Sequence, residues 1–395
     1  MDGVKRLDRI GIIFWGFGLA LIAALLALDI ANASGRPGFS INGQSLWGRD
    51  FVNLWSAGRL VIEGKTPLIY DVEAYQAWQR AALGSGIDNH NYSYPPVSLL
   101  YAPLFGALPY LAALALWLLL SATLFAMAAR PWLARLGMPS WIALVLPSTL
   151  LCLWAGHYGL IVGALWLFAW HWLEEKPLRA GAAIGLMLVK PHLAILLPVL
   201  LARRGAWRAF AAATATVVML VTASIIAFGP GLWRTYVEST SRLQLALVEE
   251  PHTLFGLMMP TPAPALYALG LSQPMVWITQ GLIVLAVVAL LLWRQPADRY
   301  RAGAAAAVAT FLVLPYGFNY DLTVVGIAAL MLLADASRSE RRTDAAVAGV
   351  ALALPPAMMF LGVVDFRPAP FVLAALFWLL LRPQEPVESA ASESR

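Results

Sequence analysis

Charged residues and cysteines are both scarce in this sequence. Asp, Glu, Lys and Arg make up only 12% of its 395 residues, whereas soluble domains carry about 25%. The single cysteine, Cys152, excludes an intramolecular disulfide, and no group of Cys and His residues has the spacing of a metal site. There is no Gly-rich phosphate loop, paired-histidine metal motif or nucleophile elbow. The familiar catalytic signatures of soluble enzymes are therefore missing.

Apolar and aromatic residues dominate instead. Apolar residues make up 60% of the chain, which contains 16 Trp and 16 Phe, as is typical of helices that cross a bilayer with aromatic side chains at its interfaces. The net charge of +5 is divided among short clusters between apolar runs. Such clusters indicate membrane topology rather than a nucleic-acid surface. We therefore predict an all-α polytopic membrane protein.

The first apolar run covers residues 10–28 and follows a short basic segment. Because Ala31-Asn32-Ala33 resembles a signal-peptidase site, a cleaved signal peptide is one interpretation. However, the run exceeds the roughly 7–15 residues of a signal-peptide core, and it is long enough to span a bilayer. We expect a retained first transmembrane helix.

Basic residues recur in compact groups between the later apolar runs. The positive-inside rule places these groups in the cytoplasm, so the stretch between two groups must cross an even number of times or contain a large external loop. This parity predicts about 12 transmembrane or re-entrant helices, with both termini cytoplasmic. The groups are Arg130 and Arg135; Lys176 and Arg179; Arg203, Arg204 and Arg208; Arg294, Arg299 and Arg301; Arg338, Arg341 and Arg342; and Arg382.

Four of these stretches are interrupted near their middle, so we expect each to form two short helices that turn on the outer side. In the stretch 180–202 each arm has only 10–12 residues, under about 18 Å, and cannot cross a roughly 30 Å core alone, so these arms need protein cover or a water-filled recess on the outer side. For the second stretch, a single tilted span is the alternative. The stretches are 140–173, broken at Gly156-His157-Tyr158-Gly159; 180–202, broken at Lys190-Pro191; 302–334, turning at 315–321; and 345–381, turning at 365–368.

Two longer segments, 29–94 and 229–272, are expected outside the membrane, and each should contain amphipathic helices that lie at the interface. We expect one helix to begin at Asp50 and a second to end at Gly84. A third should also carry Glu238 and Arg242 as an i,i+4 pair. The apolar faces expected of the three helices are Phe51, Leu54, Trp55, Val61 and Ile62; Ala74, Tyr75, Trp78 and Ala82; and Trp233, Tyr236, Thr240, Leu243 and Leu247.

These segments complete one transmembrane domain over residues 1–382. The remaining residues, 383–395, are expected to form a short disordered cytoplasmic tail. The basic groups place the broken helices and both outer segments on the side of the membrane opposite the cytoplasm.

Several short motifs follow one another in a recognisable order. They are Gly48-Arg49-Asp50-Phe51 at a helix start, Glu63-Gly64-Lys65-Thr66-Pro67-Leu68-Ile69-Tyr70-Asp71, Tyr92-Ser93-Tyr94-Pro95-Pro96, Gly156-His157, and Leu188-Val189-Lys190-Pro191-His192. Over residues 40–335 this order resembles glycosyltransferase family 87, a GT-C-type family that includes polyprenyl-phosphate-mannose-dependent α-mannosyltransferases. Two positions depart from the family pattern. His157 stands where the family has glutamine, and His252-Thr253-Leu254 stands where it has Asn-x-Ser-Leu.

The resemblance implies that Asp50 is the catalytic base. An acceptor hydroxyl loses its proton as it attacks the anomeric carbon, and one carboxylate can take that proton. The bland alternative is that Asp50 only caps its helix. Lys190 is the one charged residue within an otherwise uncharged run. Placing a charge inside a membrane costs free energy, so such a residue usually has a function. At an outer turn it could neutralise the phosphate of the donor, or it could simply extend to the interface.

Other polar residues are weaker candidates for contact with substrate. The histidines could donate hydrogen bonds to sugar or phosphate, or they could be ordinary packing residues. The segment 319–321 could contact sugar, or it could be a solvated loop tip that faces outward. The candidates are His157, His192, Asn319, Tyr320, Asp321, Arg49, Tyr94 and His252.

Taken together, the sequence predicts an inverting membrane hexosyltransferase of the GT-C type. It would move a hexose, mannose by resemblance, from a polyprenyl-phosphate donor to an outer-leaflet lipid or glycan, at a site facing the periplasm or exterior of a bacterial inner membrane. No cofactor is expected and no carboxylate pair demands a metal, although some GT-C enzymes use a divalent ion. A secondary transporter or lipid flippase is the alternative, and a non-catalytic assembly partner is a third possibility.

Overall fold

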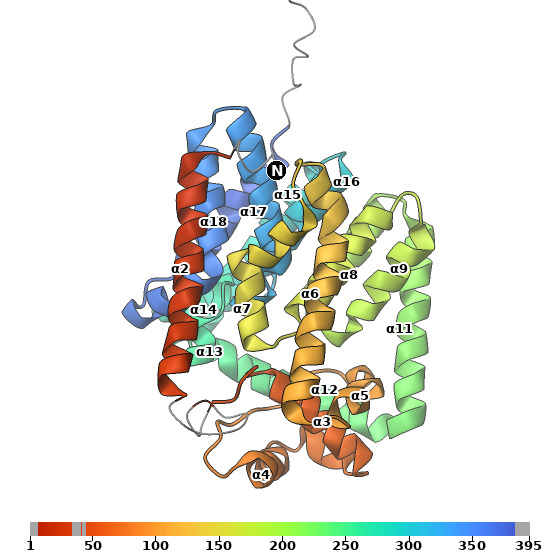
Figure 1. The fold of residues 1–395 in the computed structure, drawn as a ribbon. Coiled ribbons are helices and arrows are strands. Elements are labelled where there is room, and N and C mark those ends of the chain that lie inside the picture. Colours follow the sequence, from red (N-terminus) through yellow and green to blue (C-terminus); the bar gives the residue numbers. More distant parts are fainter. Residues whose placement is uncertain (1–6, 34–40, 42–44, 384–395) are drawn as a thin grey trace, which may run out of the picture.

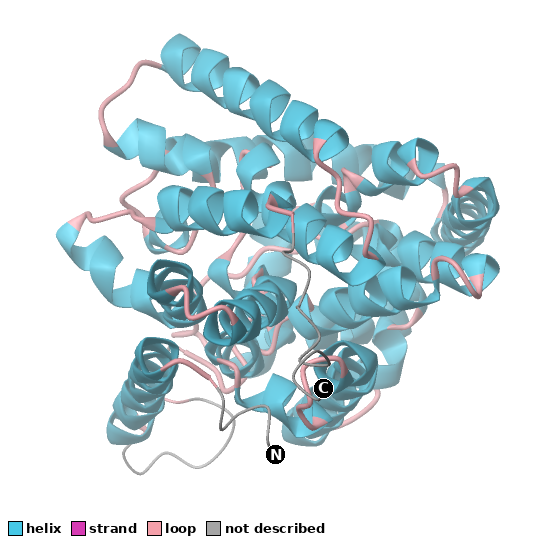
Figure 2. Cartoon of the chain, turned by 90° about the horizontal axis from the view of Figure 1, so that it is seen from above, coloured by secondary structure: helices cyan, strands magenta, loops and turns pink. Residues whose placement is uncertain are grey.

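The computed structural model describes residues 7–33, 41 and 45–383. Within these residues the chain forms helices and connecting loops, and no β-strand occurs (Figure 2). The expected all-α class is confirmed for this part of the chain. Most of the tail expected at 383–395 lies outside the described residues.

Five of the described helices are long and apolar enough to cross a membrane. Their outward faces carry large apolar side chains, such as Ile226 and Leu285, which are 80% and 69% exposed. Exposure on this scale is typical of contact with lipid, because a water-soluble surface would not display such continuous apolar faces. The five are α2 (Arg9–Asn32), α6 (Tyr110–Ala134), α11 (Trp207–Phe228), α15 (Gln273–Trp293) and α18 (Arg342–Leu361).

Shorter helices fill the space between the long ones, and they break where the sequence predicts. Gly156 ends one helix in the left-handed conformation, with a φ of 62°, which glycine adopts without a steric penalty. At the second break Lys190 lies between two short 3-10 turns, and the second of these turns begins with Pro191. The predicted count of about 12 crossings stays a prediction. The shorter helices are α7 (Pro147–Ala155), α8 (Gly159–Trp172), α9 (Pro177–Leu186), α10 (Leu197–Arg203), α16 (Arg299–Val313), α17 (Thr323–Arg338) and α19 (Ala369–Leu381).

The basic groups gather at one end of the molecule. Arg135 pairs with Asp298, Arg299 pairs with Glu174, and the Arg204 guanidinium donates to the Pro296 carbonyl. These contacts join loops that are far apart in the sequence. In Figure 1 the loop between α8 and α9 and the loop between α17 and α18 lie at the upper end. The arrangement agrees with the parity argument, which requires all of these loops on one side.

The opposite end of the molecule is built from helices of the two predicted outer segments together with the short helix Ala102–Gly106, which follows the first of these segments (Figure 1). Helix α4 ends at Gly84, as predicted. The five residues predicted for one face of α12 are all buried or half-buried. The helices at this end are α3 (Phe51–Ile62), α4 (Val72–Leu83), α5 (Ala102–Gly106), α12 (Pro230–Glu249), α13 (Leu254–Leu257) and α14 (Pro262–Ala268).

Three expectations about this end are wrong in detail. Helix α3 is not a one-sided interface helix, because Asn53 and Ser56 are buried while Ile62 is 51% exposed. Helix α4 covers these two side chains, because Gln79 donates to the Ser56 hydroxyl and the Tyr75 hydroxyl contacts Asn53. Helix α5 packs so closely at Gly58 that a Cβ there would collide with the carbonyl of Ala102. Arg242 donates to the backbone carbonyl of Glu238 rather than to its carboxylate.

The third correction concerns residues 319–321, which were expected to form a tip that faces outward. They form a short 3-10 turn between α16 and α17, and all three are buried. A buried carboxylate needs a partner of opposite charge, so the position of Asp321 implies a specific interaction inside the protein.

Candidate active site

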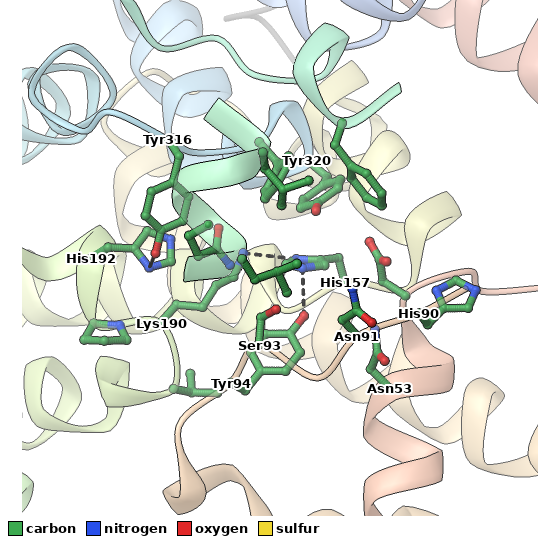
Figure 3. A pocket seen from close by; sticks show the side chains of 18 of the residues that line it. Asn53, His90, Asn91, Ser93, Tyr94, His157, Lys190, His192, Tyr316 and Tyr320 are labelled. Carbon is green, nitrogen blue, oxygen red and sulfur yellow. Dashed lines mark hydrogen bonds between the residues drawn. The ribbon is translucent and has the colours of Figure 1, made fainter. Parts of the chain in front are cut away.

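An open pocket lies at the end of the molecule opposite the basic groups, with about 940 Å³ of empty space that includes solvent at its mouth. It is formed by the start of α3, the loop that follows α4, the turns after α7 and α9, helix α12, and the loop between α16 and α17 (Figure 3). Segments from across the chain therefore meet there. Its polar lining residues are Asp50, Asn53, Asn89, His90, Asn91, Ser93, Tyr94, His157, Lys190, His192, Tyr236, Gln244, Tyr316 and Tyr320.

Asp50 lies immediately before the first residue of α3. Its backbone N–H donates to the carbonyl of Ala155 at 3.0 Å, which ties the start of α3 to the end of α7. Its carboxylate makes no capping hydrogen bond to α3. The alternative that Asp50 serves only as a helix cap therefore does not fit this geometry. Burial raises the pKa of this carboxyl to about 6, although the nearby Lys190 ammonium acts in the opposite direction.

Lys190 reaches the pocket from the break between α9 and α10. Its Nζ donates to both carboxylate oxygens of Asp321, at 2.7 and 2.8 Å. The Asp321 side chain is completely buried, whereas 6% of the Lys190 side chain is exposed. Lys190 thus lies between the pocket and a carboxylate that holds it in place.

His157 links Lys190 to Tyr94. Its Nδ1 lies 3.4 Å from Lys190 Nζ, and its Nε2 lies 2.8 Å from the Tyr94 hydroxyl, while the Tyr320 ring packs against the imidazole at 4.0 Å. Burial lowers the pKa of His157 well below its usual value, so the ring is neutral near pH 7. An ammonium can only donate, and Nδ1 is therefore the acceptor and Nε2 carries the proton. The Nε2–H therefore donates a hydrogen bond to the Tyr94 hydroxyl oxygen, and the hydroxyl hydrogen of Tyr94 remains available for a ligand.

His192 forms another part of the pocket wall. Its Nδ1 lies 3.2 Å from the Tyr316 hydroxyl, and the two rings pack at 4.8 Å. Burial, together with the Lys190 charge, lowers the pKa of His192 to about 3. This histidine is therefore a neutral hydrogen-bonding group rather than a second cation.

Four candidates from the sequence do not line this pocket. Arg49 pairs with Asp29 at 2.6 Å, on the far side of the turn that carries Asp50. Asn319 is fully buried and donates to the Pro355 carbonyl at 2.9 Å. Asp321 lies behind Lys190, and His252 is exposed, 3.6 Å from Asp365. Their contacts are therefore with protein rather than with the contents of the pocket.

Sequence reasoning missed the polar loop after α4. Asn89, His90, Asn91 and Ser93 line the pocket, and Asn53 joins them from the first turn of α3. The signal was the run Asp88-Asn89-His90-Asn91-Tyr92-Ser93-Tyr94, which is unusually polar for this chain. It was overlooked because a polar run after a helix is also what an ordinary solvated loop contains.

Within the described part of the chain, no group of three or more His, Cys, Asp and Glu side chains is arranged to hold a metal ion. Asp50 is the only carboxylate among the described residues that line the pocket. The arrangement offers one base, one paired cation and several neutral hydrogen-bond donors around a shared space.

Comparison with known proteins gives one match. The model of glycosyltransferase family 87 matches residues 92–315, more than half of the chain. The matched region includes Tyr94, His157, Lys190 and His192, and Asp50 lies upstream of it. No curated protein and no solved structure matches the chain.

Proposed function

This chain belongs to glycosyltransferase family 87 and is a membrane glycosyltransferase, and we propose that it transfers a hexose, mannose, from polyprenyl phosphate to an outer-leaflet lipid or glycan. The single observation that supports this reaction is that Asp50 and Lys190, 140 positions apart, line the same pocket. During sugar transfer from a phosphate, the acceptor hydroxyl loses a proton and the leaving phosphate oxygen gains negative charge. A carboxylate can take that proton, and a cation in the same pocket can offset that negative charge.

The proposed step is a direct displacement. Asp50 takes the proton of an acceptor hydroxyl as that oxygen forms a bond to the anomeric carbon. The bond between the anomeric carbon and the phosphate oxygen breaks, and the phosphate keeps the electron pair. Attack from the face opposite the leaving group inverts the anomeric centre. Phosphate leaves readily, so one carboxylate suffices, unlike the pair required for glycoside hydrolysis.

Lys190 and Tyr94 provide the phosphate side of the site. The Lys190 ammonium offsets the negative charge on the leaving oxygen, and the Tyr94 hydroxyl hydrogen is free to donate to the same group. Asp321 holds the ammonium from behind with two hydrogen bonds. This arrangement limits the movement of the lysine, so little reorganisation is needed when charge develops.

One side of the pocket is suited to a lipid chain. Leu243 and Leu247 of α12 line it together with Phe255 and Phe318. Beside them, Leu254 is 61% exposed, so apolar surface continues from the pocket to the outside of the protein. A polyprenyl chain could lie along this surface while its phosphate remains near Lys190.

The basic groups also support an orientation for the enzyme. They gather at the end opposite the pocket, and basic loops stay in the cytoplasm. The proposed active site therefore faces the periplasm or exterior of a bacterial inner membrane. A donor linked to a lipid suits this location, because nucleotide sugars are cytoplasmic. The short helices beneath the pocket suit a GT-C-type fold, which we include in the proposal.

The test is transfer of radiolabelled mannose from polyprenyl-phosphate mannose by the purified protein in lipid nanodiscs, with native membrane lipids as acceptor. Asp50→Asn should lower the rate of polyprenyl phosphate release by about 10²–10⁴-fold, the usual range for loss of a general base. Asp365→Asn makes the same chemical change on a half-exposed loop and should retain the wild-type rate. Normal turnover by Asp50→Asn would show that another group is the base.

A further inference from the structure

Three asparagines line the pocket on the side of Asp50. Asn53 lies one helical turn after Asp50 on α3, and Asn89 and Asn91 come from the loop that follows α4. Asn89 is exposed, Asn91 is half-buried and Asn53 is only 6% exposed. The three side chains therefore extend from the pocket opening toward the carboxylate, and Figure 3 shows Asn53 and Asn91 close to one another.

Side chains of helix α4 contact the side-chain oxygen atoms of all three asparagines. The Tyr75 hydroxyl lies 3.3 Å from Asn53 Oδ1, Gln76 Nε2 donates to Asn91 Oδ1 at 2.7 Å, and Arg80 Nη1 donates to Asn89 Oδ1 at 2.9 Å. A guanidinium can only donate, so the Asn89 amide must turn its oxygen toward Arg80. The Gln76 and Arg80 side chains thus turn the oxygens of Asn91 and Asn89 toward α4, whereas the single Tyr75 hydroxyl hydrogen is shared between the Asn53 backbone carbonyl and Oδ1, at 3.2 and 3.3 Å.

As a result, the amide nitrogens remain available. Within the described part of the chain, no protein group accepts a hydrogen bond from Nδ2 of Asn53, Asn89 or Asn91. A buried polar group is normally hydrogen-bonded, and Asn53 is buried and lines the pocket. Its N–H groups can therefore donate to a ligand that occupies the pocket.

We infer that these three amides form the subsite for the acceptor, and that the acceptor is an uncharged, polyhydroxylated sugar. The inference rests on the proposed function, because it assigns the second substrate of that reaction. A hydroxyl oxygen accepts a hydrogen bond and its hydrogen is donated. A sugar hydroxyl can therefore accept from an asparagine amide while it directs its own hydrogen at Asp50.

Charge decides which sugars fit. The amide groups are neutral, and their nitrogens share the pocket with the Asp50 carboxylate, which would repel a phosphate or uronate, whereas the Arg80 guanidinium does not line the pocket and is bound to Asn89 Oδ1, away from the amide nitrogens. Lys190 already carries Asp321 as its counter-ion and is assigned to the donor. Among the described residues that line the pocket, Lys190 is the one Lys or Arg, so an anionic acceptor would face the Asp50 carboxylate without a second cation, whereas a neutral glycoside meets hydrogen-bond donors and the base.

Binding of small glycosides without any donor tests the subsite directly. We would measure p-nitrophenyl α-D-mannopyranoside and p-nitrophenyl β-D-glucopyranoside against p-nitrophenyl β-D-glucuronide, by saturation-transfer NMR on the full chain in nanodiscs. The glucuronide differs from the glucoside only in its carboxylate. At least one neutral glycoside should bind, and the glucuronide should bind at least about fivefold more weakly than the glucoside. Equal binding of glucuronide and glucoside would overturn the inference.

Variants then locate the site. Asn89→Ala and Asn91→Ala should each weaken binding of the neutral glycosides by about 2–10-fold, the effect of one lost hydrogen bond. Asn32→Ala changes an exposed asparagine at the end of α2 and serves as the matched control. Gln76→Glu should mimic Asn91→Ala, because a carboxylate cannot donate and would turn the Asn91 nitrogen away from the pocket. Wild-type binding by all three subsite variants would refute the assignment.

Transfer kinetics separate this inference from the proposed function. With polyprenyl-phosphate mannose as donor and p-nitrophenyl α-D-mannopyranoside as acceptor, Asn91→Ala should raise KM for the acceptor and leave KM for the donor unchanged. If the wild type binds neutral glycosides but never releases polyprenyl phosphate, the proposed reaction fails and the subsite stands. If transfer proceeds and the variants keep the wild-type acceptor KM, the subsite fails and the reaction stands.

Discussion

The buried pair of Lys190 and Asp321 should control stability as well as chemistry. Its two hydrogen bonds are 2.7 and 2.8 Å long, and the side chains are 6% and 0% exposed. Lys190→Met keeps the length of the side chain and removes its charge. Asp321 is then left buried without a cation, and breaking a buried pair in this way costs about 3–5 kcal/mol. We expect the free energy of unfolding to fall by that amount.

Two further variants test the reasoning. Lys65→Met makes the same substitution in the ion pair of Lys65 with Glu63, whose N···O distance is 2.9 Å but whose side chains are 52% and 30% exposed. Such a pair contributes only about 0–1 kcal/mol. The double variant Lys190→Met with Asp321→Leu removes both buried charges, and it should recover most of the stability lost by Lys190→Met alone, because the uncompensated carboxylate is gone.

The measurement is reversible unfolding of the purified protein by SDS in mixed micelles, followed by tryptophan fluorescence. The expected order of stability is wild type and Lys65→Met close together, the double variant slightly lower, and Lys190→Met lowest. If Lys190→Met unfolds with the same free energy as Lys65→Met, the pair is not a buried charge pair. If the double variant is no more stable than Lys190→Met, the loss comes from packing rather than from the lone carboxylate.

Two other predictions concern the chemistry and the packing of the site. Because burial raises the pKa of Asp50 to about 6 and only the carboxylate can accept a proton, kcat/KM for transfer should fall below pH 6, by about tenfold per pH unit. Lys190 lowers that pKa, so Lys190→Met should move the midpoint of the pH profile above 6, and a flat profile from pH 5 to 8 would contradict the role of Asp50. Gly156→Ala and Gly205→Ala both place alanine at a left-handed φ, 62° and 64°, which costs roughly 1–2 kcal/mol. Only at Gly156 would the new Cβ collide with the backbone of Gly48, so Gly156→Ala should lose about 1–3 kcal/mol more, and equal losses in SDS unfolding would argue against that close approach.

The helices and their breaks followed from local patterns in the sequence. A long uncharged run predicts a spanning helix, and α2 and α15 formed where such runs occur. Pro191 and Gly156 lie at the predicted breaks, because proline removes a helical hydrogen bond and a left-handed glycine ends a helix. Gly84 ended α4 for the same reason. These features depend on a few neighbouring residues and can be read without knowing the fold.

The surroundings of α3 could not be predicted in this way. Its apolar residues suggested a helix with one solvent-exposed polar face. However, Asn53 and Ser56 on that face are buried, because α4 and α5 cover it. Tyr75 and Gln79 of α4 provide the hydrogen bonds that allow this burial. Periodicity indicates which face is apolar, but it does not indicate whether another helix with its own polar groups will cover the rest.

By itself the sequence determined the membrane class, the positions of the helix breaks, and the presence of polar residues such as Lys190 at those breaks, because each depends on hydrophobicity and backbone sterics over short distances. The tertiary structure alone decided that Lys190 pairs with Asp321, 131 positions away, and that α4 turns the amides of Asn89 and Asn91 toward the pocket. Hydrogen bonds and ion pairs act over only a few ångströms, so their partners are chosen by how the helices pack and not by the order of residues along the chain.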